Sequence, residues 1–111
     1  MKGLEDAGDV VVVLVTCPDE ATAGSIARAL VEERFAVCVN VVAEMRSIYR
    51  WRGSVEKASE CLLIVKARAD RLESLAERLV DLHPYEVPEL LSLRVEHGLA
   101  PYLEWLRSEG G

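Results

Sequence analysis

Long apolar runs and excess positive charge are both missing from this sequence of 111 residues. The longest apolar run, residues 10–15, has the length of a buried strand and falls far short of the roughly 20 residues that span a bilayer. The formal net charge of −6 opposes non-specific attraction to nucleic acid or to an anionic membrane. We therefore expect neither a membrane-spanning protein nor a nucleic-acid binder.

Cysteine is also sparse, and its pattern argues against a disulfide framework. The three cysteines, Cys17, Cys38 and Cys61, are odd in number, widely spaced and without a CxxC pair. This usage fits a reducing compartment, so we expect a cytoplasmic protein. Residues 1–9 carry one lysine and three acids with no apolar run behind them, which is not the layout of a secretory signal. We expect this segment to be a flexible tail.

The apolar residues that are present follow the periods of strands and helices. The β-branched run at residues 10–16 predicts a buried strand, and Pro18, Asp19 and Glu20 behind it are typical of a helix start. The helix expected over residues 19–34 carries one apolar stripe, formed by Ala23, Ile26, Ala27, Leu30 and Val31. A strand therefore leads into an amphipathic helix.

The same pattern returns in the second half of the chain. Residues 61–65 are another apolar run, and Asp70 and Glu73 resemble a helix cap. The helix that follows has its own stripe, formed by Leu72, Leu75, Ala76, Leu79 and Val80. The chain thus contains two similar strand–helix units.

Two βαβ units in tandem predict an α+β fold of the ferredoxin-like, split βαβ type (βαββαβ). Four antiparallel strands would carry both helices on one face of the sheet. We expect the fourth strand at residues 89–96 and, after Gly98, a C-terminal helix over residues 101–107. Residues 10–108 then form a single domain.

The middle of the chain predicts a β-hairpin arm that is too long for its own domain. Its strands, residues 36–51 and 55–68 around Gly53, far exceed the usual strand of roughly 5 to 6 residues. Residues 36–42 are almost wholly apolar on both faces, although a sheet with helices on one side leaves its other side open to water. Farther out, the side chains alternate between the two sides of the strand. One side carries Met45, Tyr49 and Trp51, and the other carries Arg46, Arg50 and Arg52.

These features of the hairpin predict a homo-oligomer. Identical subunits that exchange arms in a closed ring would cover both the open sheet face and the arms. The alternative is a solvated hairpin whose aromatic side chains pack locally, although long exposed strand edges favour aggregation.

Three residues carry side chains that bind transition metals. Cys17 ends the first predicted strand, where ferredoxin-like folds often place a binding loop, and His83 and Glu89 stand close together in the sequence. Cysteine and histidine suit copper or zinc, and a carboxylate can complete the coordination shell.

A structural interpretation of the same segment is the alternative. Pro84 and Pro88 would shape a turn between helix and strand, His83 would cap the helix, and Glu86 would pair with a nearby cation.

Other polar or sulfur-bearing residues have structural interpretations. Cys38 and Cys61 lie in apolar runs and are expected in the core, and His97 is typical of a surface or cap position. Lys66 and Asn40 lie in strands that look buried, so each needs a partner. They would line an intersubunit pocket or pair across the sheet.

Three segments closely resemble the CutA family of divalent-cation tolerance proteins. They are residues 16–23 (TCPDEATA), 47–53 (SIYRWRG) and 83–89 (HPYEVPE), and the resemblance extends over residues 10–105. It implies a ferredoxin-like subunit, an intertwined homotrimer similar to PII signalling proteins, and an association with tolerance of copper and other divalent metals.

The resemblance also implies a metal-binding set. It consists of a cysteine near the end of the first strand, a histidine before the Pro-Tyr motif and the glutamate after the second proline, which here correspond to Cys17, His83 and Glu89. In the alignment that we favour, however, Val15 takes the place of that cysteine and Leu82 that of a second histidine.

The sequence argues against several other functions of ferredoxin-like domains. There is no CxxC for a soft-metal chaperone, residues 62–65 lack the aromatic side chains of an RNA-recognition motif, and the acidic loop after the first strand would repel phosphate. The sequence shows no nucleophilic residue paired with a general base, so we expect no enzyme and no organic cofactor.

Two functions remain. The first is a trimer that binds divalent metal ions, with copper preferred, and contributes to metal tolerance through Cys17, His83 and Glu89. The second is a PII-like signalling or scaffold trimer that binds a small ligand or an unknown partner protein in intersubunit clefts, without direct metal handling. Its site would consist of Tyr49, Trp51, Lys66, Tyr85 and Glu86.

Overall fold

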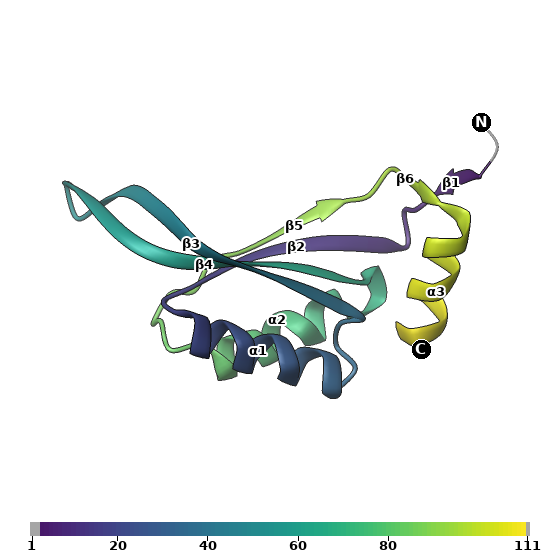
Figure 1. Cartoon of the computed structure of the whole chain (residues 1–111), viewed down its shortest axis with the longest axis horizontal. Helices are drawn as coiled ribbons and strands as arrows, with labels where there is room; N and C mark the ends of the chain where they lie inside the picture. The colour runs from purple at the N-terminus through teal and green to yellow at the C-terminus, as the bar shows by residue number, and fades with distance from the viewer. Residues whose placement is uncertain (1–2, 111) are drawn as a thin grey trace.

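The computed structural model describes residues 3–110 and has a four-stranded antiparallel sheet with two helices along one face (Figure 1). The strand order in this sheet is β3-β4-β2-β5, and a second, two-stranded sheet joins β1 and β6. This order confirms the ferredoxin-like prediction. The elements are β1 (Leu4–Asp6), β2 (Val10–Cys17), α1 (Glu20–Glu32), β3 (Cys38–Trp51), β4 (Ser54–Arg68), the short 3₁₀ helix η1 (Ala69–Arg71), α2 (Leu72–Leu82), β5 (Leu90–Arg94), β6 (His97–Leu99) and α3 (Ala100–Gly110).

Local chemistry explains where the two main helices begin. Asp19 accepts a hydrogen bond from the backbone N–H of Thr22 at 2.7 Å and so caps α1, as its side chain and position predict. The predicted cap of the second helix at Asp70 is wrong. The Asp70 carboxylate instead accepts two hydrogen bonds from the guanidinium of Arg68, at 3.1 and 2.5 Å, because η1 carries it away from the first turn of α2.

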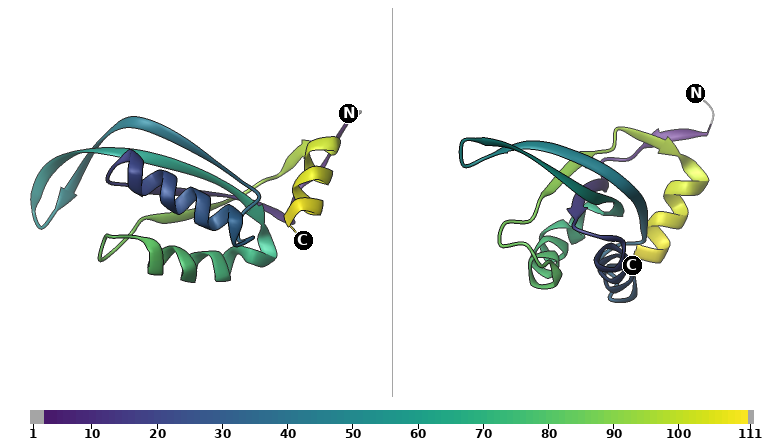
Figure 2. Two further views of the ribbon diagram at one scale, coloured as in Figure 1. Left: turned by 60° about the horizontal axis from the view of Figure 1, so that its bottom comes forward. Right: turned by 60° about the vertical axis from the view of Figure 1, so that its left-hand side comes forward.

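The main core lies between the sheet and the layer formed by α1 and α2 (Figure 2). Alternate residues of β2 and β4 point into it, and the apolar stripes of both helices meet them there. Its largest fully buried side chains include Leu30, Leu63, Leu75, Leu79, Val13, Val15 and Val65. The strand–helix periodicity in the sequence therefore corresponds to the observed packing.

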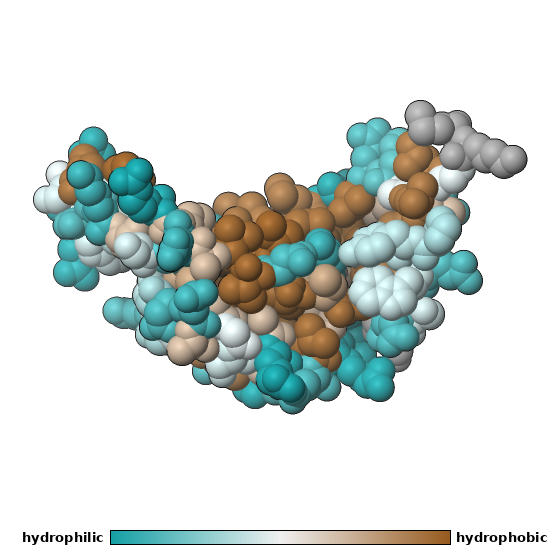
Figure 3. Space-filling view, in the orientation of Figure 1, coloured by the Kyte–Doolittle hydropathy of each residue, from teal (hydrophilic) through white to brown (hydrophobic). Residues whose placement is uncertain are grey.

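The opposite side of the sheet is apolar and faces away from α1 and α2. The strand register aligns Leu93 with Val12, and Leu91 with Leu14 and Ile64. Leu91 and Leu93 are 58% and 50% exposed. Figure 3 shows an apolar area across the middle of the molecule, over the sheet. We call this surface the open face; it is formed by Val12, Leu14, Val42, Leu62, Ile64, Leu91 and Leu93.

Lys66 and Asn40 lie on the open face and satisfy each other. The Lys66 ammonium donates to Oδ1 of Asn40 across β4 and β3. The sequence left two interpretations for these residues, an intersubunit pocket and pairing across the sheet. Within the subunit, they pair across the sheet.

The hairpin of β3 and β4 extends well beyond the end of β2, which stops at Cys17 opposite Cys61 (Figure 1). We call this extension, residues 43–60, the arm. Arg52 and Gly53 form its two-residue turn with φ values of 48° and 85°, which are typical of a type I′ turn. A bulge at residues 43–44 interrupts the register near its base. Ile48 and Val55 are 68% and 62% exposed, so the predicted long hairpin is confirmed and its apolar side chains are uncovered in one subunit.

The N-terminal segment differs from the expected flexible tail. Within it, β1 pairs antiparallel with β6, and Ala7 is fully buried against Leu103 and Leu106 of α3. The apolar side of α3 needs this cover, and residues 4–6 show no apolar alternation that would reveal a strand. Residues 1 and 2 of the predicted tail lie outside the described residues. None of the helices described is long and apolar enough to cross a membrane.

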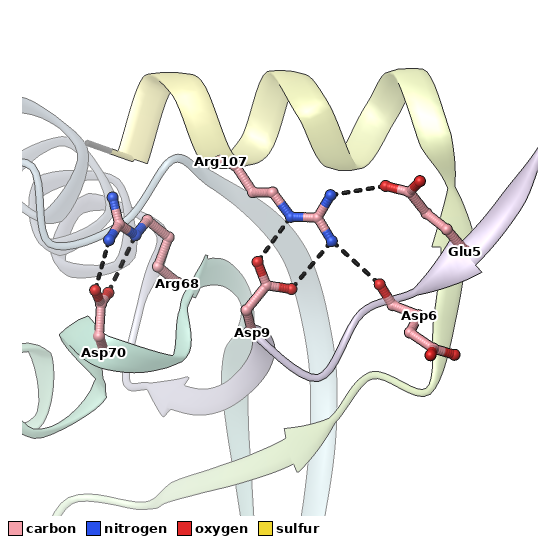
Figure 4. Close-up of polar contacts among 6 residues, drawn as sticks. All are labelled: Glu5, Asp6, Asp9, Arg68, Asp70 and Arg107. Carbon is pink, nitrogen blue, oxygen red and sulfur yellow. Dashed lines mark hydrogen bonds and ion pairs between the residues drawn. The ribbon is translucent and has the colours of Figure 1, made fainter.

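Arg107 ties α3 to the N-terminal segment (Figure 4). Its guanidinium donates to both carboxylate oxygens of Asp9 at 2.7 and 3.1 Å, to Glu5 Oε1 at 2.7 Å and to the carbonyl oxygen of Asp6 at 3.1 Å. The hydrogen bond from Arg107 lowers the pKa of Asp9 below its usual 3.8.

This pKa shift gives a testable pH dependence. Asp9→Asn should reduce stability near pH 7, because the folded state then loses an ionised carboxylate that it holds better than the unfolded state does. The difference from wild type should shrink as the pH falls below about 4, where the unfolded Asp9 protonates, and vanish below the lowered pKa of the folded state. Urea denaturation midpoints at several pH values measure it, with Asp81→Asn on α2 as control. A difference that stays constant from pH 7 to the lowest pH at which the protein remains folded would contradict the assignment.

Candidate functional site

Residues 83–89 connect α2 to β5 and hold half of the predicted site residues. His83 follows the last turn of α2, and its backbone N–H donates to the carbonyl of Leu79 at 2.9 Å. This connection lies at the same end of the sheet as the turn between β2 and α1 (Figures 1 and 2). It therefore stands beside Cys17, the last residue of β2.

Both ring nitrogens of His83 are engaged. The backbone N–H of Tyr85 donates to Nδ1 at 3.1 Å, so the ring proton is assigned to Nε2, which donates to the carbonyl oxygen of Thr16 at 2.7 Å. The side chain is only 7% exposed, and its ring packs 4.8 Å from that of Tyr85 between centroids. His83 thus joins the connection to the end of β2.

Tyr85 joins the same connection to β4. Its hydroxyl donates to Oε2 of Glu60 at 2.9 Å, and Glu60 is 9% exposed at the base of the arm. Burial, reinforced by the bond to Glu60, raises the pKa of Tyr85 to about 12. The phenol therefore stays protonated at neutral pH and serves as a hydrogen-bond donor. We call the contacts of His83 with Thr16 and of Tyr85 with Glu60 the clasp.

Cys17 lies in the core rather than at a surface loop. Its side chain is fully buried, and burial, with further contributions from Cys61, Asp19 and Glu60, raises the pKa of its thiol to about 11. A protonated, buried thiol is a poor metal ligand until it loses its proton.

The predicted metal set does not form a ready-made site in the subunit. Glu89 is exposed, Cys17 is buried, and both nitrogens of His83 already have partners. Among residues 3–110, no group of three or more His, Cys, Asp or Glu side chains is placed to hold a metal ion. The donor set as folded therefore does not fit a bound metal, and ligation by these residues would need His83 to give up a hydrogen bond.

The predicted cleft residues are spread over the subunit. Tyr49 lies on the arm close enough to Tyr85 to influence its pKa, whereas Trp51 lies near the arm tip, with the Arg52 guanidinium carbon 5.5 Å from its ring centroid. Lys66 is on the open face near the other end of β4, and Glu86 is exposed.

Sequence reasoning missed Glu60 and Thr16. Glu60 could have been noticed as an acid directly before the apolar run at residues 61–65. Thr16 contributes only a backbone carbonyl, for which the sequence carries no signal.

The comparisons with known proteins agree with this architecture. The family model described as "CutA1 divalent ion tolerance protein" matches residues 11–109. The chain belongs to the CutA family. It is 50% identical over 100 residues to the divalent-cation tolerance protein CutA of Thermus thermophilus, covering 90% of this chain and 97% of that one. It is 45% identical over 100 residues to human protein CutA, again over 90% of this chain, but spans only 56% of the human protein.

Solved CutA structures have the same fold. A divalent cation tolerance protein from Thermus thermophilus matches with a TM-score of 0.89 and 49% identity, covering 92% of this chain and 99% of that chain. CutA from Synechococcus elongatus matches with a TM-score of 0.94 and 32% identity, covering 99% and 97%. The resemblance predicted from the three motifs is confirmed, and the family is named for tolerance of divalent cations rather than for an enzymatic activity.

Proposed function

We propose that this chain acts in tolerance of divalent cations as a cytoplasmic homotrimer, with copper as the metal concerned. The observation that carries the oligomer is the open face, because burying the part of its leucine, isoleucine and valine side chains that is still exposed gains about 25 cal/mol per Å². A second copy of the same chain offers a matching apolar face, and the overhanging arm offers the means of exchange. The number three and the choice of copper come from the CutA resemblance.

The geometry favours indirect metal handling within this role. Direct ligation through Cys17, His83 and Glu89 would require breaking the clasp at His83 and ionising a thiol in the core. A signalling or scaffold trimer needs neither change, since the arms bring aromatic side chains such as Tyr49 close to the connection that holds Tyr85. We therefore favour intersubunit clefts that bind a small ligand or a partner protein, involving Tyr49, Trp51, Lys66, Tyr85 and Glu86.

A titration separates the two modes. Cu²⁺ and Zn²⁺ are added to the metal-free oligomer against a competing chelator, comparing wild type with His83→Gln, His83→Ala, Cys17→Ser and Glu89→Gln. We expect copper affinity to change less than about threefold in all four variants, because the donor atoms of the wild-type residues are not arranged for a metal. His97→Ala is the control for binding by an exposed imidazole.

The opposite result would identify direct metal binding. A fixed stoichiometry per subunit, with a loss of tenfold or more in His83→Gln and none in His97→Ala, would show that the His83 imidazole leaves the clasp to bind copper. Such a result would restore the metal-binding mode.

A further inference from the structure

Two buried cysteines face each other at the end of the sheet covered by the clasp. Cys17 on β2 and Cys61 on β4 are direct partners in the antiparallel register. Both belong to the same core cluster, and their side chains are 0% and 3% exposed. Directly opposed residues in antiparallel strands have Cα atoms about 4.5 or 5.5 Å apart, and both separations fall within the roughly 4.4–6.8 Å of disulfides.

The position of this pair gives it freedom to close. It is the last pair of the β2–β4 ladder, because the chain leaves β2 through Pro18 and enters α1 at the Asp19 cap. On the other side of β4, the bulge at residues 43–44 interrupts the β3–β4 register next to Cys61. Opposed Cβ atoms are about 4.5–5.5 Å apart and a disulfide needs about 3.5–4.5 Å, so a small inward shift suffices.

The surroundings of the two thiols favour a disulfide over a bound metal ion. Both cysteines belong to the apolar core cluster, and the carboxylates of Asp19 and Glu60 lie close enough to Cys17 to raise the pKa of its thiol. Two thiolates holding Cu⁺ would leave a net negative charge in this core, beside those carboxylates, and such a charge is costly to bury. A disulfide is neutral, so oxidation changes no charge there. The third cysteine, Cys38, is paired in register with Lys66 far along β4 and does not compete.

We propose that Cys17 and Cys61 form a reversible disulfide within one subunit when the protein meets hydrogen peroxide. When the clasp opens, one thiol gives its proton to water, its sulfur attacks a peroxide oxygen, and the O–O bond breaks; the leaving hydroxide takes up a proton, so a sulfenic acid and a water molecule form. The second sulfur then attacks the first, the S–O bond breaks and another water leaves. The two thiols lose two protons and two electrons in total, and hydrogen peroxide takes up both to become two water molecules.

The clasp controls access to this pair. His83 holds Thr16, which immediately precedes Cys17, and Tyr85 holds Glu60, which immediately precedes Cys61. Moving residues 83–89 away from the sheet would break these two contacts, each of which is next to one of the cysteines in the chain. The disulfide in turn fastens the base of the arm to β2, so the site links oxidation to the part of the subunit that reaches outward.

The test uses the full-length oligomer with Cys38→Ser, so that only the pair can react. After exposure to hydrogen peroxide, the protein is denatured, treated with N-ethylmaleimide and weighed by mass spectrometry. We expect a subunit lighter by two hydrogen atoms and free of maleimide, which dithiothreitol returns to a form carrying two maleimides. Cys17→Ala and Cys61→Val in the same background should not give the lighter species.

A second comparison tests the clasp. Tyr85→Phe removes the hydroxyl bonded to Glu60 and should speed disulfide formation at least threefold, whereas Tyr102→Phe on α3 should not. Two maleimides after prolonged oxidation, a mass gain from added oxygen without disulfide, or cross-linked dimers on a non-reducing gel would each overturn the proposal. Equal rates in Tyr85→Phe and wild type would overturn the role of the clasp.

Discussion

Replacing Ile64 with glutamate should convert the oligomer into folded monomers. Ile64 lies in the middle of the open face, between Asn40 and Leu14 in the register. In an assembly that buries this face, each subunit would place a carboxylate in a largely apolar interface where Lys66 is already paired with Asn40, at a cost of several kcal/mol per subunit. In the monomer the same carboxylate faces water, so the subunit itself should remain folded.

Size-exclusion chromatography with light scattering measures this effect. We expect the molar mass to fall from that of three subunits to that of one, with an unchanged far-ultraviolet circular dichroism spectrum. Val80→Glu is the matched control, because Val80 is exposed on α2, on the opposite side of the sheet. Leu91→Glu provides a second variant on β5 if Ile64→Glu does not fold. An unchanged mass in both would mean that the open face is not the interface.

His83→Ala should lower the free energy of unfolding by about 2–4 kcal/mol. The substitution leaves the carbonyl of Thr16 and the N–H of Tyr85 without their partner at a buried position, and it also leaves a cavity. Partial recovery is expected in His83→Asn, whose amide can accept from Tyr85, and in His83→Gln, whose amide can reach toward Thr16. Glu86→Ala, an exposed neighbour, should change stability by less than about 0.5 kcal/mol.

Guanidinium denaturation at one fixed protein concentration measures these differences, because dissociation is linked to unfolding in an oligomer. The result bears on function as well as on stability. A nearly neutral His83→Ala that loses copper binding would identify the imidazole as a ligand, whereas a destabilised variant with unchanged copper binding would identify it as a structural residue of the clasp.

The architecture was predictable because it depends on local periodicity. The stripe that includes Ala23, Ile26 and Leu30 predicts the buried side of α1, and all three are buried in the structure. Gly53 marked the turn of the long hairpin because a two-residue type I′ turn requires positive φ. Such signals lie within a few residues of the features that they determine, so a single sequence reveals them.

The site was less predictable because its contacts are distant in the sequence. His83 and Thr16 are 67 positions apart, and nothing near His83 indicates that both ring nitrogens have partners. The same limitation hid β1, whose partner β6 lies near the other end of the chain. Asp70 was misassigned for the opposite reason, since a local cap pattern competed with an equally local arginine.

The pairing of β1 with β6 also implies an order of events during folding. The hairpin of β3 and β4 closes over a two-residue turn, and such hairpins form within about 1–10 μs. Joining Leu4 to Leu99 instead closes a loop of almost the whole chain, which costs more conformational entropy, and the side chains of β1 itself stay exposed. The N-terminal strand should therefore join last, after α3 has presented Arg107, so the earliest part of the chain to be synthesised becomes the final piece of the native structure.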